Sequence, residues 1–153
     1  MKKQKSIGNK GFSLVELIIV IAIMAILIGV MAPQLLRYVE RTRVSSDTQL
    51  ADTVRTAIMT AMMDPAVDNT TIPAAGTYNI TSITAGADDA FGTLVVDILG
   101  DTTANVAAKL QSRAYHGQPI NYQITDTSQV IITITSADTT SAGNLRIPEA
   151  TTP

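Results

Sequence analysis

Apolar residues dominate one uninterrupted stretch near the N-terminus. Between Phe12 and Ala32, every residue except Ser13, Glu16 and Gly29 is strongly apolar. As a helix rising about 1.5 Å per residue, this stretch is roughly 30 Å long, which is enough to cross a bilayer. The polar segment before it carries Lys2, Lys3, Lys5 and Lys10. Basic residues on this side predict a cytoplasmic N-terminus and an external remainder of the chain.

Three other interpretations of the apolar stretch stay open. A secretory signal peptide would be cut after the stretch, and Val30-Met31-Ala32 offers a small-residue site. The stretch is long for such a signal, and Pro33 directly after the site hinders cleavage. A plain single-pass anchor leaves Glu16 unexplained. A buried helix of a soluble protein is not expected at this length and purity.

Glu16 is the residue that favours a special role for this helix. An unpaired carboxylate inside a bilayer costs on the order of 3 kcal/mol, so an acid at this depth calls for a partner. Cleavage between Gly11 and Phe12 would create an α-amine one helical turn from Glu16. That amine could pair with the carboxylate in the same chain or in a neighbouring copy.

The residues Lys10-Gly11-Phe12-Ser13-Leu14-Val15-Glu16-Leu17, with the apolar run and Pro33 after them, resemble the type IV prepilin cleavage motif. The resemblance covers about the first quarter of the chain. It implies that a prepilin peptidase cuts after Gly11 and N-methylates Phe12. It also implies that Glu16 neutralises the N-terminus of a neighbouring subunit during assembly.

The resemblance implies a division of the chain into four parts. These are a leader peptide at 1–11, a transmembrane and filament-core half-helix at 12–33, an amphipathic half-helix at 34–64 and a globular head at 65–153. The expected fold class is α+β, with the long N-terminal helix packed on a small antiparallel sheet. The absence of cysteine suits pilins without a C-terminal disulfide loop.

The function implied is structural rather than enzymatic. The chain would be a major-type pilus subunit that polymerises into a helical surface fibre for adhesion or motility. Its partners would be the prepilin peptidase, the inner-membrane assembly platform and copies of itself. It would cross the cell membrane once before assembly and lie in the extracellular pilus afterwards. Two alternatives are a pseudopilin of a type II-like secretion or DNA-uptake machine, and a membrane-tethered binding module or enzyme.

Gly29 and Pro33 predict a weak point in the helix. Pro33 cannot donate a hydrogen bond to the carbonyl of residue 29, and glycine is the poorest helix former after proline. Two interpretations remain: a kink of the kind that membrane helices tolerate, or a segment that melts locally in the fibre and makes it extensible.

Beyond Pro33 the pattern turns amphipathic and stays helical until Asp64-Pro65, since the residue before proline avoids helix. Its apolar stripe comprises Leu36, Val39, Leu50, Val54, Ala57, Ile58, Ala61 and Met62, with Asp47 weakening its middle. Later patterns predict helices around 91–99 and 106–114, and strands at 77–84, 119–125, 129–135 and, at an edge, 145–147. Residues 126–128 would join the middle two strands as a hairpin turn.

Composition narrows the possible chemistry. The chain has no cysteine, which excludes disulfides, thiol catalysis and cysteine-ligated metals. Removal of the leader lysines changes the side-chain charge from 11 − 13 = −2 to 7 − 13 = −6, which disfavours nucleic acid as a partner. Asp88 and Asp89 read better as a helix cap than as calcium ligands, and His116 as a surface residue. No cofactor and no metal are expected.

Overall fold

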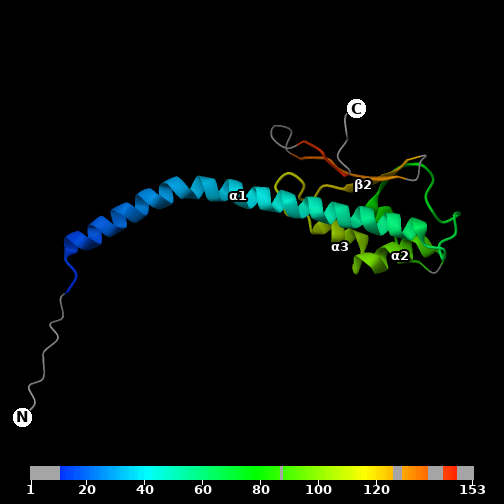
Figure 1. Ribbon diagram of the computed structural model, residues 1–153, viewed down its shortest axis with the longest axis horizontal. Helices are drawn as coiled ribbons and strands as arrows, with labels where there is room; N and C mark the ends of the chain where they lie inside the picture. The colour runs from blue at the N-terminus through cyan, green and yellow to red at the C-terminus, as the bar shows by residue number, and fades with distance from the viewer. Residues whose placement is uncertain (1–10, 87, 126–128, 138–142, 148–153) are drawn as a thin grey trace, which may run out of the picture. The chain divides into compact units, whose positions relative to one another are not determined.

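The computed structural model describes residues 11–86, 88–125, 129–137 and 143–147. It separates into two compact units, one up to Val39 and one from Glu40 onward. The elements are α1 (Leu14–Met63), β1 (Gly76–Asn79), the 3-10 helix η1 (Ile80–Ser82), α2 (Ala90–Leu99), α3 (Thr103–Ala108), β2 (Ile120–Ile124), β3 (Val130–Ile134) and β4 (Leu145–Ile147) (Figure 1). One long helix and an antiparallel 4-stranded sheet confirm the predicted α+β class.

The sheet is a simple meander in the order β1-β2-β3-β4, with every neighbouring pair antiparallel. Tyr78 of β1 lies opposite Tyr122 of β2, which lies opposite Ile132 of β3. The rings of Tyr78 and Tyr122 are stacked with centroids 5.5 Å apart. Because alternate residues of a strand share a face, this row and the pairs two residues away, Ile120 with Ile134 and Ile124 with Val130, form the core side of the sheet.

The second half of α1 supplies the other side of this core. In Figure 1 the sheet lies on one side of this half-helix, and α2 and α3 lie on the other. Its fully inaccessible apolar residues are Ala51, Val54, Ala57, Ile58 and Ala61. The predicted stripe is therefore confirmed in this region, but Leu36 and Val39 are exposed, at 72% and 36%. The stripe was extended too far toward the N-terminus, because the helix contacts the core only from Val44 onward.

Two carboxylates of α1 hold the chain segment that follows α3. The Asp47 side chain is 1% exposed and accepts hydrogen bonds from the amides of Gln111 and Ser112, at 2.8 and 2.9 Å. Glu40, two turns earlier on the same face, accepts from the Arg113 amide at 2.6 Å. A buried carboxylate is tolerable when its oxygens accept hydrogen bonds, so Asp47 is a structural residue rather than a flaw in the stripe. Burial and the nearby Asp47 raise the pKa of Tyr115 above its ordinary value.

This use of backbone amides explains why the predicted helix at 106–114 was wrong. The observed helix α3 begins earlier, at Thr103, because the Thr102 side chain caps it by accepting from the Asn105 amide. It ends at Ala108, and the amides of Gln111 and Ser112 bond to Asp47 instead of to carbonyls one turn back. Hydrogen bonds to the side chain of Asp47, which is distant in the sequence, thus replace the backbone hydrogen bonds that would continue the helix.

The predicted strand at 77–84 was also too long. After Asn79 the chain turns into η1, because the Asn79 side-chain oxygen accepts from both the amide and the hydroxyl of Thr81, each at 2.9 Å. Asparagine favours such local turns over a continuing ladder. The edge strand at 145–147 and the strands within 119–125 and 129–135 are confirmed as β4, β2 and β3. The turn predicted at 126–128 lies outside the described residues.

Helix α2 confirms the prediction for 91–99. Asp89 is its N-cap and accepts from the Gly92 amide at 2.8 Å, and Gly100 ends it in the left-handed conformation, with φ of 67°. Gly92 itself is needed for close packing, since a Cβ there would lie 2.2 Å from the Thr84 carbonyl oxygen. Met59 and Met62 pack against the core, whereas Met63 is 80% exposed.

The outer surface of α1 in the second unit is rich in threonine. The hydroxyls of Thr53, Thr56 and Thr60 donate to the carbonyls of Gln49, Asp52 and Thr56, respectively, at 2.8–2.9 Å. Each bond reaches back one helical turn, a pattern that competes mildly with the helix's own hydrogen bonds. These hydroxyl protons are therefore already satisfied within the helix.

We expect Asp47→Asn to lower the free energy of unfolding by about 2 kcal/mol. An amide offers only one accepting oxygen, so one of the two backbone donors would lose its partner in a buried position. The control is Asp52→Asn on the exposed side of α1, where the carboxylate lies 3.9 Å from Arg55. That change should cost less than about 0.5 kcal/mol. Urea unfolding of the full chain in detergent measures both, and equal values for the two variants would refute the role given to Asp47.

Candidate functional site

The site predicted for processing lies just before α1. Gly11, Phe12 and Ser13 are outside the helix, which begins at Leu14 rather than at Phe12 as predicted. The Phe12 side chain is 94% exposed. A Cβ placed on Gly11 would meet no atom within 4 Å. The peptide bond between Gly11 and Phe12 therefore lies in an open, non-helical segment, the kind of backbone that a peptidase can bind in extended form.

Glu16 caps the start of α1. Its Oε2 atom accepts a hydrogen bond from the Ser13 amide at 2.9 Å, and the Leu17 amide donates to the Ser13 carbonyl at 3.2 Å. The Ser13 hydroxyl accepts a longer bond from the Val15 amide at 3.4 Å. The bond from the Ser13 amide to Glu16 is the acid half of a capping box, and the Ser13 hydroxyl caps the Val15 amide in place of the amide of residue 16. The carboxylate also lies at the positive end of the helix dipole.

The cap leaves part of the Glu16 carboxylate available. Oε1 accepts no hydrogen bond from any residue in the described part of the chain. One carboxylate can accept several hydrogen bonds, so Oε2 can serve the helix while Oε1 binds a second donor. The arrangement can therefore hold a cation such as an α-amine without uncapping α1.

In the described part of the first unit, the apolar side chains of α1 are exposed. The helix is long and apolar enough to cross a membrane, and its most apolar 18 residues have a mean hydropathy of 3.0 and include no buried residue. The large apolar side chains from Leu14 to Leu36 are mostly 50–70% exposed, as expected for a helix that packs against no other element. Exposed apolar surface on this scale marks a membrane or protein contact.

Gly29 and Pro33, the residues predicted to weaken the helix, lie inside α1, which is continuous through both. Nothing lies within 4 Å of a Cβ placed at Gly29, so packing does not require a glycine there. The carbonyl of residue 29 has no donor four residues later because Pro33 lacks an N–H group. Local melting at this point stays a prediction.

Comparisons with known proteins bear on this same segment. Residues 8–32 match the prokaryotic N-terminal methylation motif. The N-terminal segment is therefore similar to the methylated N-terminus of such prokaryotic proteins. This chain is 43% identical over 56 residues to the type IV major fimbrial protein FimA of Dichelobacter nodosus, covering 37% of this chain and 36% of that protein. It is 45% identical over 53 residues to a fimbrial protein of Moraxella nonliquefaciens, covering 35% and 34%.

The pilin-like similarity is confined to one part of the molecule. The chain spans about a third of the length of the curated relatives it matches. No solved structure matches the chain. The match to the methylation motif, at residues 8–32, includes Gly11, Phe12 and Glu16 and most of the apolar run, and the roles predicted for these three residues stay predictions.

Ser13 is the residue of this pilin-like site whose role the sequence interpretation missed. The pattern Ser13-Leu14-Val15-Glu16 is a capping-box signature that directly precedes an apolar run. The capping signal is therefore present in the sequence, whereas the only partner predicted for Glu16 was the new α-amine. The structure assigns Glu16 a partner in the uncut chain.

No second chemical site stands out in the rest of the described chain. Among the residues that the structure describes, no group of three His, Cys, Asp or Glu side chains is arranged to hold a metal ion. Asp89 is used as the cap of α2, and the His116 ring nitrogen Nδ1 lies 2.9 Å from the Leu110 carbonyl oxygen. His116 is exposed, as predicted.

The predicted weak point should be visible in amide hydrogen exchange of the full chain in detergent. We expect amides from Ile28 to Met31 to exchange faster than those from Leu17 to Met24, which serve as the internal control. The double variant Gly29→Ala, Pro33→Ala restores a donor and removes a residue that costs about 1 kcal/mol in a helix, so it should slow this exchange about fivefold or more. Equal rates in both segments of the unaltered chain would refute the weak point.

Proposed function

We propose that this chain is the structural subunit of a type IV pilus. A prepilin peptidase cuts it after Gly11 and N-methylates Phe12, and the trimmed chain polymerises into a helical surface fibre. The observation that carries this proposal is the pairing of the methylation motif at residues 8–32 with an apolar helix whose side chains are exposed in the described part of the first unit. The helix needs a bilayer before assembly and other copies of itself afterwards.

The energetics of apolar burial support a helix that lies first in a membrane and then in a fibre. Burying a large aliphatic side chain is worth about 1.5–3 kcal/mol. Side chains of Ile, Leu, Val and Met suit both lipid and a packed protein interior, so transfer from membrane to fibre leaves the apolar surface covered throughout. A soluble monomer would have to expose it to water.

Glu16 supplies register within the proposed fibre. Cleavage leaves an α-amine at Phe12, and Oε1 of Glu16 is free to accept from it while Oε2 keeps the cap on Ser13. A copy in the wrong register would bury an unpaired charge, at a cost of roughly 3–5 kcal/mol. Pairing across copies therefore selects one arrangement of the helices.

The proposal also assigns location and partners. The chain crosses the cell membrane once through the first half of α1, and an inner-membrane assembly platform moves it into an extracellular fibre used for adhesion or motility. The relatives carry the names of fimbrial proteins, which favours a surface fibre over the short assembly of a secretion pseudopilin. No catalytic role is proposed.

Mass spectrometry of material sheared from the cell surface tests the proposal directly. We expect the dominant species of this chain to begin with N-methylated Phe12, since that product reports both cleavage and release in a fibre. Detection of the Phe12 form in the membrane fraction alone would exclude an abundant surface fibre. Persistence of peptides from residues 1–10 in the membrane-bound protein would contradict processing altogether.

The charge of Glu16 can be separated from its capping role with two variants. Glu16→Leu removes both, and Glu16→Gln keeps an oxygen for the Ser13 amide but cannot neutralise an amine. We expect both variants to enter the membrane, with Leu favoured there by about 3 kcal/mol, and both to reduce sheared fibre at least about tenfold. Normal fibre yield from the Gln variant would show that the cap, rather than the charge, is what assembly needs.

A further inference from the structure

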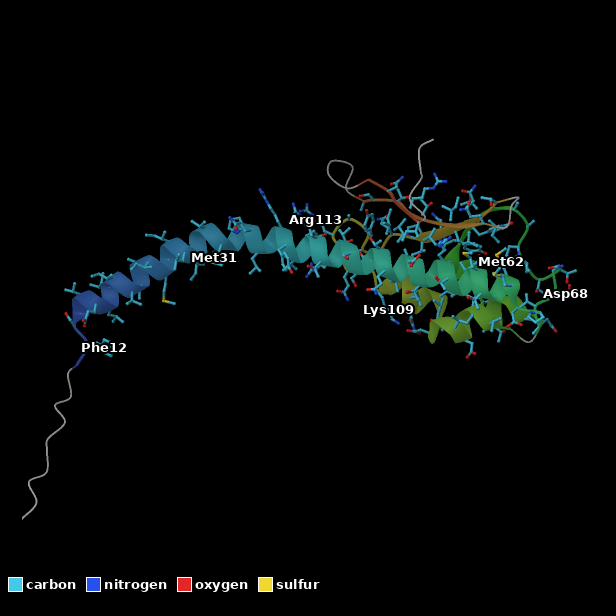
Figure 2. All side chains as sticks on the ribbon, viewed as in Figure 1. Phe12, Met31, Met62, Asp68, Lys109 and Arg113 are labelled. Atoms are coloured by element: carbon cyan, nitrogen blue, oxygen red, sulfur yellow. The ribbon has the colours of Figure 1, made fainter. Side chains whose placement is uncertain are left out.

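Charge is distributed unevenly along the second unit. Residues 56–108 include six aspartates and no lysine or arginine. Positively charged arginines lie near Glu40. The backbone amide of Arg113 lies 2.6 Å from Oε1 of Glu40, and the Arg43 guanidinium lies 3.9 Å from Oε2. Arg41 is the next residue along α1 after Glu40. Figure 2 places Arg113 and Asp68 toward opposite ends of the unit. The helix from Arg41 to Asp64 accounts for a separation of roughly 35 Å.

Some of these charges are already used inside the unit. Lys109 lies 2.9 Å from Asp101 and, with the Asn105 side chain and the Thr102 amide, lowers the pKa of Asp101 to about 2. Asp89 caps α2. Within the described part of the chain, by contrast, Arg41, Arg113, Asp64 and Asp97 form no ion pair. Both signs are therefore available for contacts outside the unit.

Two of the available carboxylates line a groove at the acidic end. The cavity of about 580 Å³ lies between α2 and the segments that follow α1 and η1. Its walls include Val67, Leu94 and Val96, and Asp64 and Asp97 also line it. An arginine suits such a groove because its aliphatic stem packs on apolar walls while its planar head bonds to carboxylates. Charge pairs beside apolar walls are screened less than pairs in open solvent.

We propose that this groove receives the arginine-bearing end of a second copy of the chain, with Arg113 and Arg41 directed at Asp97 and Asp64. The inference rests on the proposed function, since it supplies a contact between the heads of neighbouring fibre subunits. The two surfaces lie at opposite ends of one unit, so the contact is head-to-tail. A head-to-tail contact that does not close on itself generates an open helical assembly.

Charge exchange tests the contact in cells that make the full chain. Asp97→Arg and Arg113→Asp each place like charges opposite one another, so each should reduce sheared fibre at least about tenfold. The double variant Asp97→Arg, Arg113→Asp restores opposite charges in every contact and should recover yield to within about threefold of the unaltered chain. Asp88→Arg, an exposed acid of the same end outside the groove, is the matched control and should have little effect. Unchanged yield from both single variants would overturn the contact.

Cross-linking tests the geometry without altering these charges. The chain has no native cysteine, so Ala90→Cys in the groove and Gln111→Cys beside Arg113 introduce the only thiols. With a short bis-maleimide, sheared fibres of the double variant should give a ladder of covalent oligomers, and each single variant should give none. Dimers from a single variant would indicate a symmetric contact and overturn the proposal, as would the absence of a ladder in intact fibres.

The same experiments separate this inference from the proposed function. If the unaltered chain is not trimmed to Phe12 or yields no surface fibre, the proposed function fails and the head contact fails with it. If the unaltered chain forms fibres and the charge variants form them equally well, only the head contact fails. A groove occupied by a different basic protein would give a cross-linked product of mixed composition in place of the ladder.

Discussion

Burial of apolar side chains along one face of α1 is the interaction on which the second unit depends. Ala51, Val54, Ile58 and Ala61 are inaccessible to solvent, and the sheet, α2 and α3 all contribute to the same core. At about 25 cal/mol per Å² of apolar surface, this burial is the main stabilising term available to a chain without disulfides. The carboxylates of Glu40 and Asp47 make that packing specific, because they bind the backbone amides of residues 111–113 and so fix which segment lies against the helix.

The first half of α1 belongs to the same helix, but its apolar side chains are exposed instead of buried. Its apolar side chains surround the helix instead of forming a stripe, so no single neighbour in a small domain could cover them. Glu16 is tolerated at its start because a helix N-terminus offers amide donors and a favourable dipole. The helix therefore has two parts that differ in burial: the second half buries its apolar stripe against the sheet, α2 and α3, and the first half leaves its apolar side chains exposed in the described residues.

The sequence predicted those elements whose signals are local. The long helix, its end before Pro65, α2 with its aspartate and glycine caps, and the strands β2, β3 and β4 follow from periodicity and turn residues. The errors arose where distant residues decide local structure. Asp47 uses the amides of Gln111 and Ser112, which shortens α3, and the Asn79 side chain ends β1. In the candidate site, Gly11, Phe12 and Glu16 could be recognised from their spacing, whereas the Ser13 cap was overlooked.

The threonines on the outer surface of α1 make that surface less polar than the sequence indicates. Thr53, Thr56 and Thr60 are polar residues, yet each hydroxyl proton is donated to a carbonyl of the same helix. These three hydroxyls then offer water only their acceptor lone pairs. Covering this surface leaves none of the three hydroxyl protons unsatisfied, so its dehydration penalty is smaller than three free threonine hydroxyls would suggest.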